Sequence, residues 1–197
     1  VHRRAASLDG LAELVAGAFS SDPHRSRRFG EELFLDPGRA YGSYQDMLEG
    51  ELRLPASERI DFVSIVTPNN SHFDIAKAFI EAGFHVVCDK PLTTTLEDAE
   101  ELCRLVEEHR TVFLVTHNYT GYPMVKQARD LVREGKLGTI RKIVAEYPQG
   151  WLANAEGISM WRLDPKIAGI SSAVGGPAHT ALIWAESSSI SVRRRLG

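Results

Sequence analysis

The chain has 197 residues and a formal net charge of -3 at pH 7, with 43% hydrophobic and 25% charged residues. This composition is typical of a globular protein with one packed core, or with one domain and part of a second, and it gives no reason to expect nucleic acid or a membrane as a partner. The two cysteines, Cys88 and Cys103, have no CxxC neighbours, which excludes a disulfide framework and indicates reduced thiols in a cytoplasmic protein; no metal site is expected.

The first 60 residues predict short elements that alternate between helix and strand. In chain order we expect the end of a helix at 1–10, a strand of small residues at 13–20, a basic helix at 24–34, a short helix at 41–49 and a polar connection at 52–59. The basic helix carries Arg25, Arg27 and Arg28.

The most informative stretch of the sequence then reads strand, turn, helix, turn, strand. An apolar run rich in β-branched residues, 60–66, predicts a strand that is buried on both faces. Proline and asparagine in the turn at 67–70 end that strand, and apolar residues recur at helical spacing after it. A second strand at 85–88 brings Asp89 and Lys90 to its carboxyl end. The pattern is that of a βαβ unit, whose ligands bind at the carboxyl ends of the strands.

Strands and helices continue to alternate after this unit. Thr94 and Glu97 have the spacing of a capping box at the start of the next helix. A buried-type strand follows at 111–116, and an amphipathic helix at 124–134. The sequence therefore predicts a doubly wound α/β domain over 1–138.

The pattern changes at residue 139. Residues 140–149 alternate loosely, as in a half-exposed strand, and the chain from 171 onward is rich in glycine, serine and alanine without a pattern for a packed element. We expect 139–197 to be the incomplete start of a second domain of the α+β class.

Four motifs carry a resemblance to a known family. They are VSIVTPNNSH at 63–72, EAGFHVVCDKPLTTT at 81–95, EGKLGTI at 134–140 and WRLDP at 161–165. With them the chain resembles the Gfo/Idh/MocA oxidoreductases, which act on sugars, inositols and related polyols with NAD or NADP. The resemblance covers about residues 1 to 170 and implies a Rossmann-like coenzyme domain, a second domain for substrate and oligomerisation, and a homo-oligomer.

The resemblance assigns the central chemical role to Lys90. A cation at the carboxyl end of a strand can stabilise the alkoxide that develops as hydride leaves the substrate. Asp89 stands where the family usually has glutamate, and the resemblance implies that Pro91 helps to fix the turn over the nicotinamide. The alternative for Lys90 is an ordinary surface lysine, which the adjoining proline and the matched motif spacing disfavour.

The resemblance also implies that the turn after the first strand of the βαβ unit lies along the dinucleotide. This turn contributes Thr67, Pro68, Asn69 and His72. For His72 the sequence leaves a second interpretation open, a residue at the helix start whose ring is satisfied by nearby backbone.

The substrate is expected to meet residues that follow the third strand and residues of the second domain. His117, Asn118 and Tyr119 end the strand at 111–116, and Asn118 and Tyr119 are the candidate substrate contacts. Tyr119 is equally compatible with a core aromatic residue. Arg162 resembles a substrate-side position of the second domain.

The expected coenzyme preference depends on the end of the strand at 13–20. Dinucleotide enzymes often place an acid there for the ribose 2′-hydroxyl, and this chain has Ser20 with Arg25 close behind. A hydroxyl and a cation tolerate a 2′-phosphate, so both NAD and NADP are compatible with the sequence. The alternative is that the arginines of this helix simply face solvent.

Two departures from the family pattern modify these expectations. The sequence contains no glycine-rich turn of the GxGxxG type, and its first residues correspond to the helix that follows this turn in the family. We therefore interpret the 197 residues as a fragment of a longer protein, with a gap between the strands at 13–20 and 61–66, poor folding on its own and weak dinucleotide binding.

The second departure lies at 175–179, where the family pattern is close to Gly-Asp-x-Gly-x-His. Gly176 replaces the aspartate and His179 arrives one residue early. His179 remains a candidate general acid/base because imidazole exchanges protons near neutral pH; the alternatives are a loop histidine and a reading-frame error near residue 175. The leading hypothesis is a sugar or polyol dehydrogenase, and the alternative is an inactive remnant that keeps a binding or scaffold role.

Overall fold

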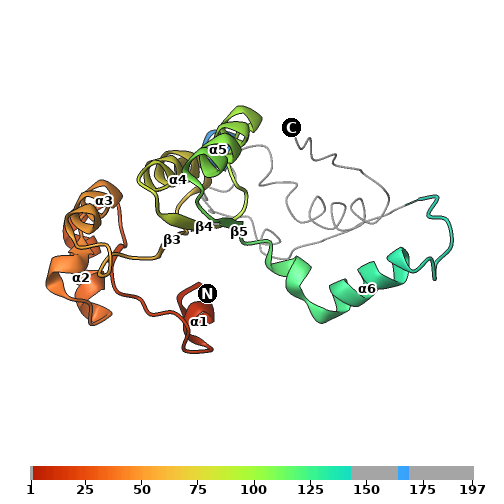
Figure 1. The fold of residues 1–197 in the computed structure, drawn as a ribbon, viewed down its shortest axis with the longest axis horizontal. Helices are drawn as coiled ribbons and strands as arrows, with labels where there is room; N and C mark the ends of the chain where they lie inside the picture. Colours follow the sequence, from red (N-terminus) through yellow and green to blue (C-terminus); the bar gives the residue numbers. More distant parts are fainter. Residues whose placement is uncertain (1, 143–163, 169–197) are drawn as a thin grey trace, which may run out of the picture.

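In the computed structural model, which describes residues 2–142 and 164–168, helices alternate with short strands (Figure 1). The helices and strands are α1 (His2–Ser7), β1 (Gly17–Ala18), α2 (Pro23–Glu32), β2 (Ala40–Tyr41), α3 (Tyr44–Arg53), β3 (Phe62–Ile65), α4 (His72–Glu81), β4 (His85–Cys88), α5 (Leu96–His109), β5 (Phe113–Val115), α6 (Pro123–Arg133) and α7 (Pro165–Ala168). Single 3-10 turns lie at η1 (Pro37–Arg39), η2 (Asn69–Ser71) and η3 (Asn118–Gly121).

The described strands form two parallel sheets. One sheet pairs β1 with β2, and the other has the order β3-β4-β5. Helical crossovers join the parallel strands, with α4 between β3 and β4 and α5 between β4 and β5, and the two helices lie side by side over one face of the three-stranded sheet (Figure 1). This arrangement confirms the α/β class and the Rossmann-like crossovers predicted from the sequence.

The core lies between this sheet and its two helices. Phe79 and Ile80 of α4 are fully buried, and Val86 and Cys88 of β4 face them. The rings of Phe79 and Phe84 meet edge to face, with 5.8 Å between their centroids. The helical spacing of the apolar residues in α4 thus produces the packed layer that holds β3 and β4 in place.

Burial on both faces, expected for the strand at 60–66, is not found in the described part of the chain. Residues of β3 alternate between exposed and buried, and Phe62 keeps 41% of its surface exposed. Within the described residues, helices cover the face of the sheet that carries Val63 and Ile65.

The first strand is shorter than predicted, and its pairing extends to Tyr41, which was predicted to begin a helix. Of residues 13–20, Gly17 and Ala18 are paired, and they pair with β2. Buried Ser26 of α2 explains this partner, because its hydroxyl accepts from Phe19 N at 2.7 Å and donates to Tyr41 O at 2.6 Å. The side chain therefore links the ends of β1 and β2. As expected, β1 and β3 do not pair.

The short helix predicted at 41–49 begins and ends later. It starts at Tyr44 because Ser43 is extended and caps it, its hydroxyl accepting from Asp46 N at 3.0 Å, and it continues to Arg53. The helices predicted at 24–34 and 124–134 correspond to α2 and α6.

Most of the expected second domain, 139–197, lies outside the described residues, so the boundary at 138 stays a prediction. In the part that the structure describes, no helix has the length and apolar character needed to cross a membrane.

Candidate functional site at the carboxyl edge of the sheet

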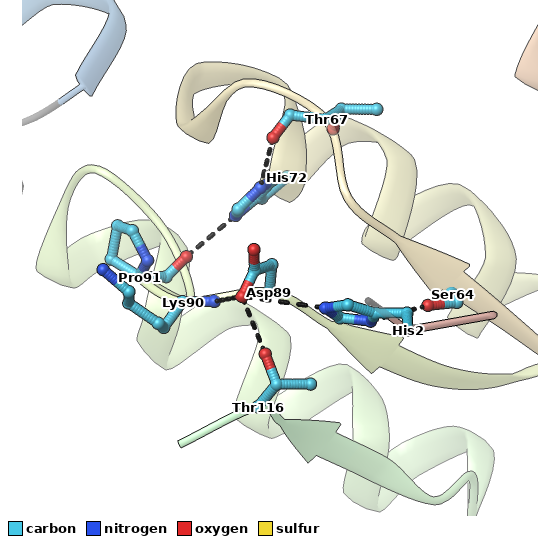
Figure 2. Close-up of polar contacts among 8 residues, drawn as sticks. All are labelled: His2, Ser64, Thr67, His72, Asp89, Lys90, Pro91 and Thr116. Atoms are coloured by element: carbon cyan, nitrogen blue, oxygen red, sulfur yellow. Dashed lines mark hydrogen bonds and ion pairs between the residues drawn. The ribbon is translucent and has the colours of Figure 1, made fainter. Parts of the chain in front are cut away.

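The three parallel strands β3, β4 and β5 end at the same edge of their sheet. The turn after β3 brings Thr67 to this edge, the end of β4 brings Asp89 and Lys90, and the end of β5 brings Thr116 (Figure 2). The strand ends are tied to one another through the backbone, since Asp89 N donates to Ile65 O at 2.9 Å. The edge is therefore a rigid base for the polar residues of the motifs.

The Asp89 carboxylate connects two strand ends. Its Oδ1 atom accepts from the Lys90 backbone N at 2.9 Å and from the Thr116 hydroxyl at 2.7 Å. His2 lies on the other side, with Nε2 at 3.9 Å from the same oxygen and Nδ1 at 3.1 Å from the Ser64 hydroxyl. These contacts hold the carboxylate within the protein framework.

Lys90 is half-buried, and the Lys90–Pro91 peptide bond is cis. Its backbone is fixed by the bond to Asp89. Among the described residues, the Lys90 ammonium group has no hydrogen-bond or ion-pair partner. The residue thus combines a fixed backbone with a cation that can meet a ligand.

The structure agrees with the second interpretation of His72, a residue at the helix start whose ring is satisfied by nearby backbone. The ring is fully buried, with Nδ1 at 2.8 Å from Pro91 O and Nε2 at 3.0 Å from Thr67 O. Both ring nitrogens are therefore occupied by backbone, and the imidazole offers no surface to a dinucleotide.

The turn that carries the other proposed dinucleotide contacts is held by local hydrogen bonds. The Ser71 hydroxyl donates to Pro68 O at 2.7 Å and lies 2.8 Å from the Thr67 hydroxyl. Thr67 and Pro68 are exposed at the sheet edge, whereas Asn69 is buried. Thr67 and Pro68 can therefore meet a ligand directly, and the coenzyme contact of Asn69 stays a prediction.

Ser20 and Arg25 follow β1, which belongs to the two-stranded sheet. Ser20 lies just after the strand, and Arg25 lies on α2. The Ser20 hydroxyl accepts from Asp22 N at 3.2 Å, and the Asp22 carboxylate caps α2 by accepting from Arg25 N at 2.7 Å. The Arg25 guanidinium lies over the Phe29 ring, 5.3 Å from its centroid. In the described part of the chain, no hydrogen bond or ion pair joins this group to Asp89 and Lys90.

The candidate substrate contacts are only partly described. Asn118 is exposed at the start of η3, and the Tyr119 ring meets the Tyr122 ring edge to face, with 5.7 Å between the ring centroids. Arg162 and His179 lie outside the described residues. No group of metal ligands occurs in the portion of the chain that the structure describes.

The sequence did not identify Thr116 as a site residue, although a signal was present. Cys88 and Val115 are opposite each other in the sheet, so the next residues along each strand, Asp89 and Thr116, are neighbours. Alignment of the two strand ends would have predicted this pair. His2 has no comparable signal, because its contact with Asp89 depends on the placement of α1.

Cys88, the residue before Asp89, has its thiol buried in the core. Burial, with a contribution from the Asp89 charge, raises the pKa of Cys88 to about 12. Because the thiolate is the reactive form of cysteine, Cys88 is a core residue and no nucleophile.

Comparisons with known proteins agree with the fold and the motifs. Residues 2–117 match the family model described as an oxidoreductase family with an NAD-binding Rossmann fold, GFO_IDH_MocA. The uncharacterized oxidoreductase YfiI of Bacillus subtilis is 39% identical over 180 residues, which cover 88% of this chain and 45% of the relative. The levoglucosan dehydrogenase of Pseudarthrobacter phenanthrenivorans is 38% identical over 182 residues, 82% of this chain and 46% of the relative.

Among solved structures, the inositol dehydrogenase homolog from Azotobacter vinelandii complexed with NAD+ has a TM-score of 0.82 and 39% sequence identity. The match covers 94% of this chain and 48% of that chain. The chain thus spans about half the length of the relatives it matches. On the family match, which includes the polar strand ends of the site, the chain belongs to the Gfo/Idh/MocA oxidoreductase family, with its NAD-binding Rossmann fold.

Proposed function

We propose that this chain is part of a dehydrogenase that transfers hydride between a carbinol carbon of a sugar-like or polyol substrate and NAD or NADP. The observation that carries the proposal is Lys90, a half-buried cation at the carboxyl end of β4 whose ammonium group has no partner among the described residues. Similarity to a levoglucosan dehydrogenase and to an inositol dehydrogenase homolog supports the substrate class.

The residues present fit the nicotinamide half of such a coenzyme. Thr67 and Pro68 are exposed and Lys90 is half-buried at the same strand edge, where open parallel sheets bind ligands. When bound, the coenzyme supplies the hydride acceptor. Ser20 and Arg25 are assigned to the adenosine end, where a hydroxyl and a nearby cation accommodate either coenzyme.

Lys90 is the proposed catalytic residue. Oxidation of a carbinol needs loss of the hydroxyl proton as hydride leaves the carbon, so negative charge develops on the oxygen. An ammonium group at this position stabilises that charge by a charge-assisted hydrogen bond. In this proposal His179 shares the proton transfer, and Asn118, Tyr119 and Arg162 contact the substrate.

The proposal includes a division of labour along the chain. Residues 1–138 hold the coenzyme, and 139–197 begin a domain for substrate binding and homo-oligomer formation.

Replacement of Lys90 by Met tests the proposal in the full-length enzyme. We expect kcat with a polyol substrate to fall by about 10²- to 10⁴-fold, the usual range for loss of a proton-handling group, while the Kd for NADH changes little. Lys77→Met is the control, because Lys77 lies on α4 in an ion pair with Glu101. An unchanged rate in Lys90→Met would remove the lysine from the mechanism. Coenzyme binding by the unmodified protein without turnover of any polyol would favour the non-catalytic alternative.

A further inference from the structure

The buried ring of His72 bridges two loops of the site. It belongs to the first residue of α4 and points towards the loop that follows β4 (Figure 2). Nδ1 lies 2.8 Å from the carbonyl oxygen of Pro91, and Nε2 lies 3.0 Å from that of Thr67. One carbonyl directly follows Lys90, and the other belongs to the turn after β3.

Both partners of the ring are hydrogen-bond acceptors. A backbone carbonyl has no proton to donate, and a neutral imidazole has one N–H and one bare nitrogen. With a single proton, the ring would satisfy one carbonyl and turn a lone pair towards the other at hydrogen-bond distance. Two N–H groups satisfy both. The geometry therefore fits an imidazolium ring that donates in two directions.

We propose that His72 is the positioning residue for Lys90, and that it acts as a doubly protonated ring clamped between Thr67 O and Pro91 O. The ring is fully buried, so it does not touch the substrate or the coenzyme. It holds Pro91 from one side while Asp89 holds the Lys90 backbone from the other, at 2.9 Å. Lys90 is thereby fixed relative to the exposed turn at Thr67. This role rests on the proposed function insofar as Lys90 is the catalytic group.

The protonation state of the His72 ring can be measured without an activity assay. We expect a proton–nitrogen spectrum of the full chain with isotope-labelled histidine, at a pH of about 6, to show two slowly exchanging ring N–H signals from one residue. Exposed imidazolium protons exchange too quickly to be seen in this way, and only a clamped ring retains both. His72→Asn, which offers at most one donor group, assigns the signals by their loss. A single ring N–H signal from His72, or none, would overturn the clamp.

A kinetic comparison separates positioning from a purely structural role. In the full-length enzyme we expect His72→Asn to lower kcat by about 10- to 100-fold through misplacement of Lys90, with the KM for the coenzyme within about twofold of the original. Ile75→Ala is the matched control, since Ile75 is also buried on α4 but contacts neither loop through a polar bond. An equal fall in kcat in both variants would overturn the positioning role. If the unmodified enzyme turns over no polyol, the proposed function fails, and the ring N–H signals still decide the clamp.

Discussion

At the scale of single residues, the candidate site depends on how Asp89 is held. Its Oδ1 atom accepts from the Thr116 hydroxyl at 2.7 Å and from Lys90 N at 2.9 Å. The Thr116 bond is charge-assisted, but the Asp89 side chain keeps 44% of its surface exposed, so water can replace part of it.

Thr116→Val removes this donor with almost no change of shape. We expect a loss of about 0.5–1.5 kcal/mol in the free energy of unfolding, measured as a lower urea midpoint, and a several-fold fall in kcat because the carboxylate no longer fixes Lys90 N. Thr120→Val serves as the control, since that exposed hydroxyl donates only locally, to His117 O, and should change stability by less than about 0.5 kcal/mol. Equal urea midpoints for the two variants would show that Thr116 does not hold Asp89.

The sequence alone predicts those parts of the candidate site that are formed by residues next to one another in the chain. Asp89, Lys90 and Pro91 are contiguous, and their position after an apolar run places them at a strand end. Thr116 was not predicted, because its contact with Asp89 depends on the register between β4 and β5. The role of His72 stayed open because neither of its acceptors, Thr67 O and Pro91 O, can be inferred from side-chain identity.

At the scale of elements, a buried ionic network fastens α3 to its neighbours. The Glu51 carboxylate is fully buried and accepts from Arg39 Nη2 at 2.6 Å, from the Tyr41 hydroxyl at 3.0 Å and from Ile60 N at 3.0 Å. Burial, reinforced by the bond to Glu51, raises the pKa of Tyr41 to about 12. One carboxylate therefore connects η1, β2, α3 and the segment just before β3.

Glu51→Gln removes the charge and keeps the size of the side chain. The change leaves Arg39 without a counterion, and breaking a buried ion pair costs about 3–5 kcal/mol. We expect about 3 kcal/mol by urea unfolding, the lower end, because Arg39 keeps 22% of its side-chain surface exposed. The control Glu49→Gln breaks an exposed pair with Arg53 and should cost less than about 1 kcal/mol. Similar losses in both variants would contradict the anchoring role of Glu51.

Sequence patterns predicted the helices of the chain more accurately than the strands of residues 1–60. The apolar spacing of α4 and α5 contains its own signal, because each helix forms hydrogen bonds within itself. A strand needs a partner elsewhere in the chain. The partner of β1 is Ala40–Tyr41, and Tyr41 was predicted to begin a helix. The buried Glu51 was missed for a similar reason: a glutamate in a helix resembles a solvent-facing residue until its partners are known.

At the scale of the whole molecule, the three-stranded sheet has two unlike faces in the described part of the chain. The face carrying Val86 and Cys88 lies under α4 and α5, whereas Phe62 and Leu114 on the opposite face keep 41% and 54% of their surface exposed. Parallel sheets normally bury both faces. The stability of the described part therefore depends strongly on the layer formed by α4 and α5. Whether these helices cover the sheet in solution is a test of the fold.

The two cysteines report on this layer, because Cys88 lies beneath it and Cys103 is exposed on α5. Alkylation requires the thiolate, and burial raises the pKa of Cys88 to about 12, so the thiol stays protonated in the folded chain. We expect iodoacetamide at a pH of about 8 to label Cys103 and to spare Cys88, and to label both in denaturant, where a free thiol has a pKa near about 8.5. Because the folded pKa is the higher one, this thiol contributes stability that is complete below a pH of about 8.5 and is lost as the pH rises towards about 12. A Cys103→Ser chain isolates the reading from Cys88, and labelling of its remaining thiol at the denatured rate in native buffer would show that the helical layer is not closed over the sheet.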